Sequence, residues 1–179
     1  MVFMHVKLQS ATIEDAESIA ALRNAVSDDL TFKHGRGPWT AHSTTASVLL
    51  DVREPSLFVA LHRGEVVASL KLSDKKPWAI DLGYFPKVAL PLYLTEMVVA
   101  PDLQRQGIGR ECLNQVAVVA RRKKADAIFL DAFDHSTAGT GPFYKKCGYR
   151  ETGRAAYRGN PLVYYEIFLG KSHLSKSKR

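Results

Sequence analysis

The segment from Leu92 to Ala132 restricts the possible folds most, because it contains a strand, a helix and a second strand in that order. The first run, 92–100, is apolar and stops at Pro101. Residues 108–124 carry apolar side chains at helical spacing, and 127–132 is a short apolar run typical of a buried strand. A strand–helix–strand unit of this length predicts a right-handed crossover between two parallel neighbouring strands.

The rest of the chain predicts antiparallel strands and further helices around this unit. Two β-rich runs joined by a turn at 63–65 are typical of a hairpin. The remaining strands are predicted at 2–11, 57–62, 66–72, 150–157 and 163–169, and the remaining helices at 13–27, 44–52 and 142–147. The predicted fold is therefore of the α/β (α+β) class: a mixed, mostly antiparallel sheet with a central parallel pair, flanked by helices.

Length and composition favour a single globular domain over 1–170, followed by a basic tail at 171–179. The 179 residues are 46% hydrophobic and 24% charged, which is close to the average of soluble proteins. No apolar run reaches the roughly 18 residues of a membrane span, and the N-terminus lacks the pattern of a signal peptide. Two cysteines imply no disulfide framework, so a cytoplasmic protein without a membrane partner is expected.

The polar turn inside the strand–helix–strand unit is Gln104-Arg-Gln-Gly-Ile-Gly109, and its residue types suit an anion. Gly107 and Gly109 have no Cβ, so a ligand can approach the backbone closely. The first N–H groups of the following helix have no partner within the helix and face the turn. Together with Arg105 and Arg110 they predict a pyrophosphate site. The net charge of +7 suits an anionic ligand, whether a nucleotide cofactor or a nucleic acid.

Three other interpretations of this turn are possible. The two glycines can simply tighten a turn between a strand and a helix. A dinucleotide site of the Rossmann type would need a third glycine where Cys112 stands; Asp131 lies at about the expected distance, but a polar spacer precedes Gly107 and too little chain follows Asp131. A P-loop would need the sequence Gly-Lys-Ser or Gly-Lys-Thr, which is absent.

The turn and a second segment resemble the GNAT superfamily of N-acetyltransferases. That family carries a Gln/Arg-x-x-Gly-x-Gly/Ala motif, which Gln104, Gly107 and Gly109 match after a Val-x-Pro step at 99–101. The segment 143–149 is similar to the family's tyrosine, lysine, glycine and aromatic positions before its last strands. The resemblance extends over His5 to Leu169 in element order. It implies the acetyl-CoA N-acyltransferase fold and acetyl-CoA as the co-substrate, with no metal.

The resemblance also assigns residues to the cofactor. Backbone groups of Met97, Val98 and Val99 are expected to pair with the pantetheine arm like an added strand. The pyrophosphate is expected at the residues of the turn and the first turn of the helix: Gln104, Arg105, Gln106, Gly107, Ile108, Gly109 and Arg110. Thr137 and Lys146 complete the predicted cofactor contacts. Thr137 stands where many relatives have Asn, so its contact with pantetheine departs from the family pattern.

Two residues are predicted to be catalytic. Tyr144 occupies the position of the family's general acid, beside the expected thioester sulfur; the alternative is one more aromatic on a short helix. Glu96 is the candidate general base, because an acidic residue in an apolar strand is costly unless it is partnered or exposed in a cleft. The alternative is a hydrogen-bonded Glu without a catalytic role. By resemblance, a backbone N–H near Val98 stabilises the oxyanion.

Other candidate groups are weaker. Cys147 lacks a neighbouring His or acid in sequence, so a nucleophilic role is not expected. His135 is either a second base or a surface residue. The six histidines and two cysteines show no ligand spacing typical of a metal site.

The predicted activity is transfer of an acetyl group from acetyl-CoA to a primary amine of a small molecule or protein. The alternatives are a non-catalytic acyl-CoA-binding sensor on the same fold and a basic nucleic-acid-binding module, although no nucleic-acid-binding motif is recognisable. No nucleic-acid partner is therefore expected, and the protein is expected to be a monomer or homodimer. The loops 31–43 and 73–91 are predicted to shape the acceptor site, and their aromatic residues either form an amine pocket or pin the loops to the core: Trp39, Trp78, Tyr84 and Phe85.

Overall fold

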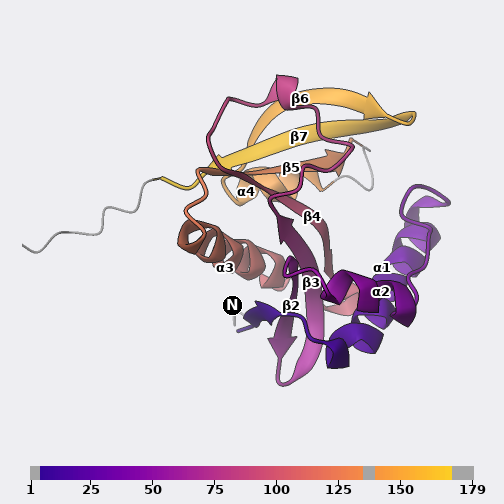
Figure 1. Ribbon diagram of the computed structural model, residues 1–179. Helices are drawn as coiled ribbons and strands as arrows, with labels where there is room; N and C mark the ends of the chain where they lie inside the picture. Colours follow the sequence, from indigo (N-terminus) through magenta and orange to yellow (C-terminus); the bar gives the residue numbers. More distant parts are fainter. Residues whose placement is uncertain (1–4, 135–139, 171–179) are drawn as a thin grey trace, which may run out of the picture.

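One seven-stranded sheet organises the computed structural model, which describes residues 5–134 and 140–170. The strand order is β1-β2-β3-β4-β5-β7-β6, as Figure 1 shows for the larger part of the sheet. The strands are β1 Lys7–Ser10, β2 Leu57–His62, β3 Glu65–Ser73, β4 Pro91–Val99, β5 Ala127–Phe133, β6 Arg150–Tyr157 and β7 Asn160–Phe168. The α-helices are α1 Ala16–His34, α2 Thr45–Val52, α3 Ile108–Arg122 and α4 Gly141–Lys146, and short 3-10 turns cover Ile13–Asp15, Leu82–Tyr84 and Pro101–Leu103.

The pairing of β4 with β5 is parallel, and all other pairs of neighbouring strands are antiparallel. The predicted mixed sheet with a central parallel pair is therefore confirmed. The parallel pair is short, since its register runs only from Pro91 opposite Ala127 to Tyr93 opposite Phe129. Beyond that point the two strands diverge, although each continues for several residues. The middle of the sheet thus opens where its two halves meet.

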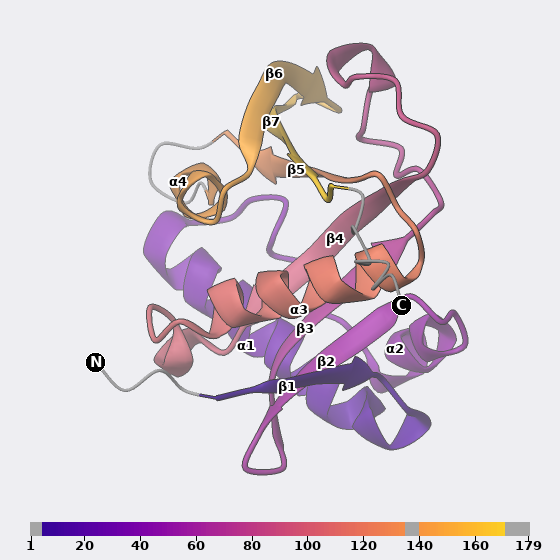
Figure 2. The same ribbon diagram turned by 90° about the vertical axis from the view of Figure 1, so that its left-hand side faces the viewer.

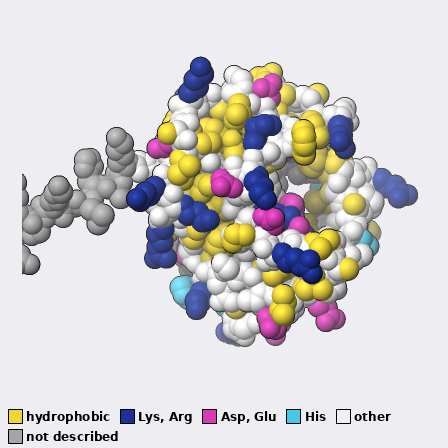
Figure 3. Space-filling model, viewed as in Figure 1, with side chains coloured by type: hydrophobic (Ala, Val, Ile, Leu, Met, Phe, Trp, Pro, Cys, Tyr) yellow, Lys and Arg dark blue, Asp and Glu magenta, His cyan; other side chains and the backbone are white. Residues whose placement is uncertain are grey.

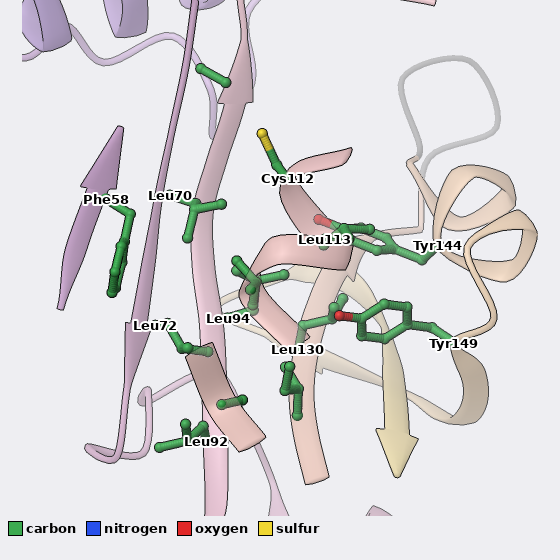
Figure 4. Close-up of a cluster of buried hydrophobic side chains, with 14 of the residues drawn as sticks. Phe58, Leu70, Leu72, Leu92, Leu94, Cys112, Leu113, Leu130, Tyr144 and Tyr149 are labelled. Carbon is green, nitrogen blue, oxygen red and sulfur yellow. The ribbon is translucent and has the colours of Figure 1, made fainter. Parts of the chain in front are cut away.

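Helices cover both faces of the sheet. Figure 2 shows α3 in front of the central strands and α1 with α2 behind them. The main core lies between α3 and the sheet, and Figure 4 shows leucines of β3, β4 and α3 meeting there. A second cluster packs α1 and α2 on β2, and a third lies under the segment 79–88 on β4, β5 and β7. None of the helices in 5–134 and 140–170 is long and apolar enough to cross a membrane.

Several element boundaries differ from those predicted. Helix α1 continues to His34, past the predicted end at Ser27, and stops at Gly35, whose φ of 77° favours glycine. The signal was present, because Lys33 and His34 complement the helix dipole just before that glycine. The predicted strand 2–11 appears only over Lys7–Ser10, and residues 1–4 lie outside the described part of the chain.

Candidate active site at the divergence of β4 and β5

A β-bulge interrupts β4 at the point where the sheet opens. Thr95 pairs with Lys71 and Val98 with Ser69, so two residues of β4 stand opposite one residue of β3. Glu96 lies in this bulge at a φ of 52°, in the left-handed region that non-glycine residues seldom occupy. A bulge re-aims side chains and bends its strand. It therefore turns the second half of β4 away from β5 and presents Glu96 outside the regular alternation.

The second half of β4 has one open edge. Its residues Val98 and Val99 pair with β3 on one side. On the other side, no described strand pairs with β4 after Tyr93. Backbone N–H and C=O groups on an unpaired edge can accept an extended ligand as an added strand. The structure thus brings the predicted pantetheine contacts, Met97 to Val99, to an edge that is chemically suited to them.

The predicted pyrophosphate turn follows directly from this edge. Arg105 and Gly107 have φ values of 63° and 87°, and α3 begins at Ile108. Alternation into left-handed backbone conformations turns successive N–H groups toward one side, which makes an anion-binding concavity next to the helix N-terminus. The amides of Gln104 and Gln106 donate to the carbonyl oxygens of Val99 and Asp102 at 3.2 and 3.1 Å. These two side chains therefore brace the turn, while Arg105 is exposed.

Gly109 and Arg110 connect the start of α3 to α4. A Cβ at Gly109 would lie 3.0 Å from Cζ of Phe143, so close helix packing requires glycine there. Nη2 of Arg110 donates to the carbonyl oxygen of Lys146 at 3.3 Å. Ile108 is 1% exposed, so it can offer a ligand only its backbone, whereas the side chain of Lys146 is exposed. The turn and the helix that carries Tyr144 are therefore one connected unit.

Tyr144 enters the main core from α4, and Figure 4 shows it beside Tyr149. Its ring packs on Tyr149 and Tyr165 with centroid distances of 5.7 and 5.8 Å. Its hydroxyl makes no hydrogen bond within the described residues. Burial, with a smaller contribution from the Asp131 carboxylate, raises the pKa of Tyr144 far above its ordinary value. The phenol therefore keeps its proton at neutral pH and is available as a donor.

Glu96 belongs to a network of four charges from four elements. Its carboxylate oxygens lie 2.9 Å from Nη2 of Arg23 and 2.9 Å from Nζ of Lys71. The same two cations contact Asp51 at 2.9 and 2.8 Å. Partial burial raises the pKa of Asp51, but hydrogen bonds from Lys71 and Arg23 outweigh it, so its pKa is lowered overall. The apolar surroundings expected from the strand sequence are replaced by two cations, while the side chain of Glu96 stays 46% exposed.

A groove of about 420 Å³ borders this network. Thr95 and Glu96 form one end, and the segment 73–78 with the 89% exposed Trp78 forms the other. Figure 3 shows acidic and basic side chains close together beside a hollow, right of the centre of the view. A polar acceptor can therefore reach Glu96 from outside.

The four predicted aromatic residues of the loops have different positions. Phe85 stacks on Phe129 at 4.4 Å and Tyr84 packs on Tyr164 at 5.3 Å, so both pin their loop to the core. Trp39 packs edge-on against Phe133 at 6.0 Å. Among the four, Trp78 alone lines the groove.

The two cysteines are buried or half-buried thiols. Cys112 is fully buried, and burial raises its pKa to about 12. Burial also raises the pKa of the Cys147 thiol, against a hydrogen bond from Arg110. Within 5–134 and 140–170, His, Cys, Asp and Glu side chains form no group of three or more that could hold a metal ion. The predicted residues His135 and Thr137 lie outside the described residues.

A model of the GNAT acetyltransferase family matches residues 19–149, which includes the turn, the bulged strand and α4. The chain belongs to this family. Its members in general transfer an acetyl group from acetyl-CoA, so the chain is an acetyltransferase by family. No curated protein matches the sequence.

Several solved structures share the fold of this chain. An N-acetyltransferase from Staphylococcus aureus has 18% identity and a TM-score of 0.68, with 93% of this chain and 99% of that chain covered. A Salmonella typhimurium protein, solved with its cofactor acetyl-CoA, has 16% identity, a TM-score of 0.65 and coverage of 97% and 99%. The ribosomal-protein-S18-alanine N-acetyltransferase from Escherichia coli has 14% identity, a TM-score of 0.66 and coverage of 96% and 98%.

Sequence reasoning missed the partners of Glu96. Arg23, Asp51 and Lys71 come from α1, α2 and β3, and they lie far from Glu96 in the chain. A hydrophobic pattern reports which face of an element is buried, but it does not report which charges from different elements meet. The bulge carried no signal either, because glutamate does not favour a positive φ.

Proposed function

We propose that the protein is an N-acetyltransferase that transfers the acetyl group of acetyl-CoA to a primary amine of a small molecule or protein. The observation that carries the proposal is the open edge of β4. It continues into a turn whose geometry suits an anion, and the helix after this turn is joined to the helix of Tyr144. This is the arrangement that an extended pantetheine arm with a pyrophosphate at one end requires.

In the proposed complex, main-chain groups of Met97, Val98 and Val99 hold the pantetheine. The turn 104–110 holds the pyrophosphate, with Arg105 as the exposed cation and Lys146 close by on α4. In this arrangement the β4 main chain orients the pantetheine arm, and the turn 104–110 neutralises the charge of the pyrophosphate. Acetyl-CoA then lies across the opening of the sheet with its thioester toward the core side of β4.

The proposed chemistry is direct attack. The amine nitrogen forms a bond to the thioester carbonyl carbon, the C–S bond breaks, and Tyr144 donates its proton to the departing thiolate. The nitrogen then loses its remaining extra proton to the Tyr144 phenolate, which leaves a neutral amide. A backbone N–H near Val98 stabilises the oxyanion that develops on the carbonyl. A carboxylate at the groove accepts the proton of the ammonium, directly or through water. Glu96 is the candidate predicted from the sequence, although Arg23 and Lys71 already neutralise its charge.

The first test is thiol release from acetyl-CoA in the presence of amines. Polyamines, amino acids, aminoglycosides and peptides with free N-termini are the acceptors to compare. The expected result is thiol release with at least one class. The sensor alternative predicts a higher melting temperature with acetyl-CoA but no thiol release with any class, so one protein sample separates the two.

The Tyr144→Phe variant tests the general acid. Because the hydroxyl makes no hydrogen bond within the described residues, its removal is expected to cost little stability. Loss of the general acid is expected to lower kcat about 10²-fold or more. Tyr149→Phe is the matched control, since it removes a phenol from the same aromatic cluster. Equal activity of the Tyr144→Phe variant and wild type would remove this residue from the mechanism.

A further inference from the structure

Asp131 is a partly buried carboxyl group that the proposed mechanism has not used. It lies on β5, two residues after Phe129, which is the last residue of β5 that pairs with β4. Side chains alternate along a strand, so Asp131 faces the same side of the sheet as Ala127 and Phe129. These two pack in the cluster under the segment 79–88, on the face opposite to α3. Asp131 therefore lies on the open side of the diverging strands.

The same face of β4 carries the groove. Tyr93 is the residue opposite Phe129, and it belongs to the same cluster. Thr95 follows two positions later and lines the groove with Glu96. If the parallel register continued, Thr95 would stand opposite Asp131; because the strands diverge, a gap separates them instead. The two strands thus present one carboxylate each, Glu96 from β4 and Asp131 from β5, to the two sides of this opening.

The electrostatic surroundings of the two carboxylates differ. Glu96 has an ion pair with Arg23 and another with Lys71. Asp131 has no ion pair within the described residues, and burial raises its pKa against a backbone hydrogen bond that lowers it. A carboxylate without a cation gains more from an incoming ammonium ion than one that is already neutralised.

The groups around Asp131 are phenols and another acid. Tyr164 stands opposite it on β7, and burial, followed by the Asp131 and Asp81 charges, raises the pKa of Tyr164. Tyr144 approaches from α4, and the Asp131 charge adds to the effect of burial on its pKa. The nearest acid beyond β5, Asp134, is paired with Arg154 at 2.5 Å. Among the described residues, the groups around Asp131 therefore attract a cation and do not supply one.

We propose that Asp131 binds the ammonium group of the acceptor and accepts its proton, while Glu96 with its two cations shapes the opposite wall of the opening. The inference rests on the proposed N-acetyltransferase activity. An N–H bond of the ammonium breaks and the proton goes to the Asp131 carboxylate. The freed lone pair forms the C–N bond, the C–S bond breaks, and the proton of Tyr144 goes to the thiolate. The nitrogen, now bonded to the acetyl carbon, loses its second proton to the Tyr144 phenolate, which leaves a neutral amide and restores the phenol. Asp131 then loses its proton to water.

Full pH–rate profiles of Asp131→Asn and Glu96→Gln test this assignment with the best acceptor amine. Wild-type kcat/KM is expected to rise with pH on the acid side of the profile, because the base must be ionised. The midpoint of this acid limb is expected above the pKa of an ordinary carboxyl group, because burial raises the pKa of Asp131. Asp131→Asn is expected to lose this limb and to lower kcat/KM by about 10²-fold or more. Glu96→Gln is expected to keep the limb with a smaller loss. The pH–rate profile is measured again with a second acceptor whose amine has a different pKa. A limb that comes from the enzyme keeps its position, whereas a limb that comes from the acceptor amine shifts with the pKa of that amine.

Two controls exclude a purely structural effect. Asp134→Asn removes a carboxylate from the chain just after β5 and is expected to retain the limb and the wild-type rate. Asp131→Glu keeps a carboxylate and is expected to restore part of the limb. Retention of the limb in Asp131→Asn, or its loss in Glu96→Gln alone, overturns the inference and leaves the acetyltransferase proposal intact. Failure of the wild type to acetylate any amine overturns both.

Discussion

The two ends of the opening between β4 and β5 are built in different ways. At the proposed cofactor end, the suited groups are main-chain N–H and C=O groups of one continuous stretch, from the β4 edge to the start of α3. At the proposed acceptor end, side chains from α1, α2, β3 and β4 form a charge network, and Asp131 of β5 is proposed to face it from the other side. We therefore expect mutations at the two ends to have separate effects. The proposed cofactor site uses main-chain groups, whereas the proposed acceptor site uses side chains.

The largest expected effect is a loss of acetyl-CoA affinity caused by a change in the turn 104–110. Gly107→Val forces a β-branched residue to a φ of 87°, a strain of about 1–3 kcal/mol that the turn must bear. The free variant is expected to relieve this strain by leaving the turn conformation, which acetyl-CoA must then restore on binding. Since about 1.4 kcal/mol corresponds to a tenfold change in affinity, acetyl-CoA binding is expected to weaken by about 10- to 100-fold. Isothermal titration with acetyl-CoA measures this effect.

Gly64→Val is the matched control for this change. Gly64 has a φ of 89° in the β2–β3 turn, with nothing within 4 Å of its added Cβ. It carries the same backbone strain, but far from the β4 edge in the chain, so stability is expected to fall while acetyl-CoA affinity stays at the wild-type value. Wild-type affinity in Gly107→Val would contradict the assignment of the turn.

A change at the acceptor end is expected to act on stability and on acceptor use. Lys71→Met removes the cation that bridges Asp51 and Glu96 and leaves Arg23 to balance both. Because the side chain of Lys71 is 19% exposed, the expected loss is about 1–2 kcal/mol, between the values for surface and buried pairs. Urea unfolding measures it.

A double-mutant cycle sharpens this result. Adding Glu96→Gln to Lys71→Met is expected to cost less than the sum of the two single changes, because they share one interaction. Acetyl-CoA affinity is expected to stay unchanged in all three variants. A change in that affinity would show that the two ends are coupled.

The smallest expected effect is a pH dependence that comes from Asp51. Its pKa is lower in the folded protein than its ordinary value, so its contribution to stability is complete above that ordinary value. The contribution is lost as the pH falls through the lowered pKa. Urea unfolding of wild type and Asp51→Asn between pH 6 and about 3 is expected to show a smaller acid-side loss in the variant. Parallel curves would contradict this assignment.

The order of elements and the glycine-containing turn before α3 were predictable from local patterns. Helix α3 was recognisable from its apolar spacing, and the turn from two glycines placed before it. The length of the crossover predicted the parallel pair that the structure contains. The late end of α1 was missed, although Gly35 marked it.

The sequence by itself determined the fold class, the family and the chain segment suited to a pyrophosphate, because these depend on periodicity and on residues close together in the chain. Only the tertiary structure decided where β4 leaves β5 and which cations meet Glu96. The physical reason is that a bulge and a charge network depend on contacts between residues distant in sequence. The acceptor end is therefore the part of this protein that local sequence patterns describe least.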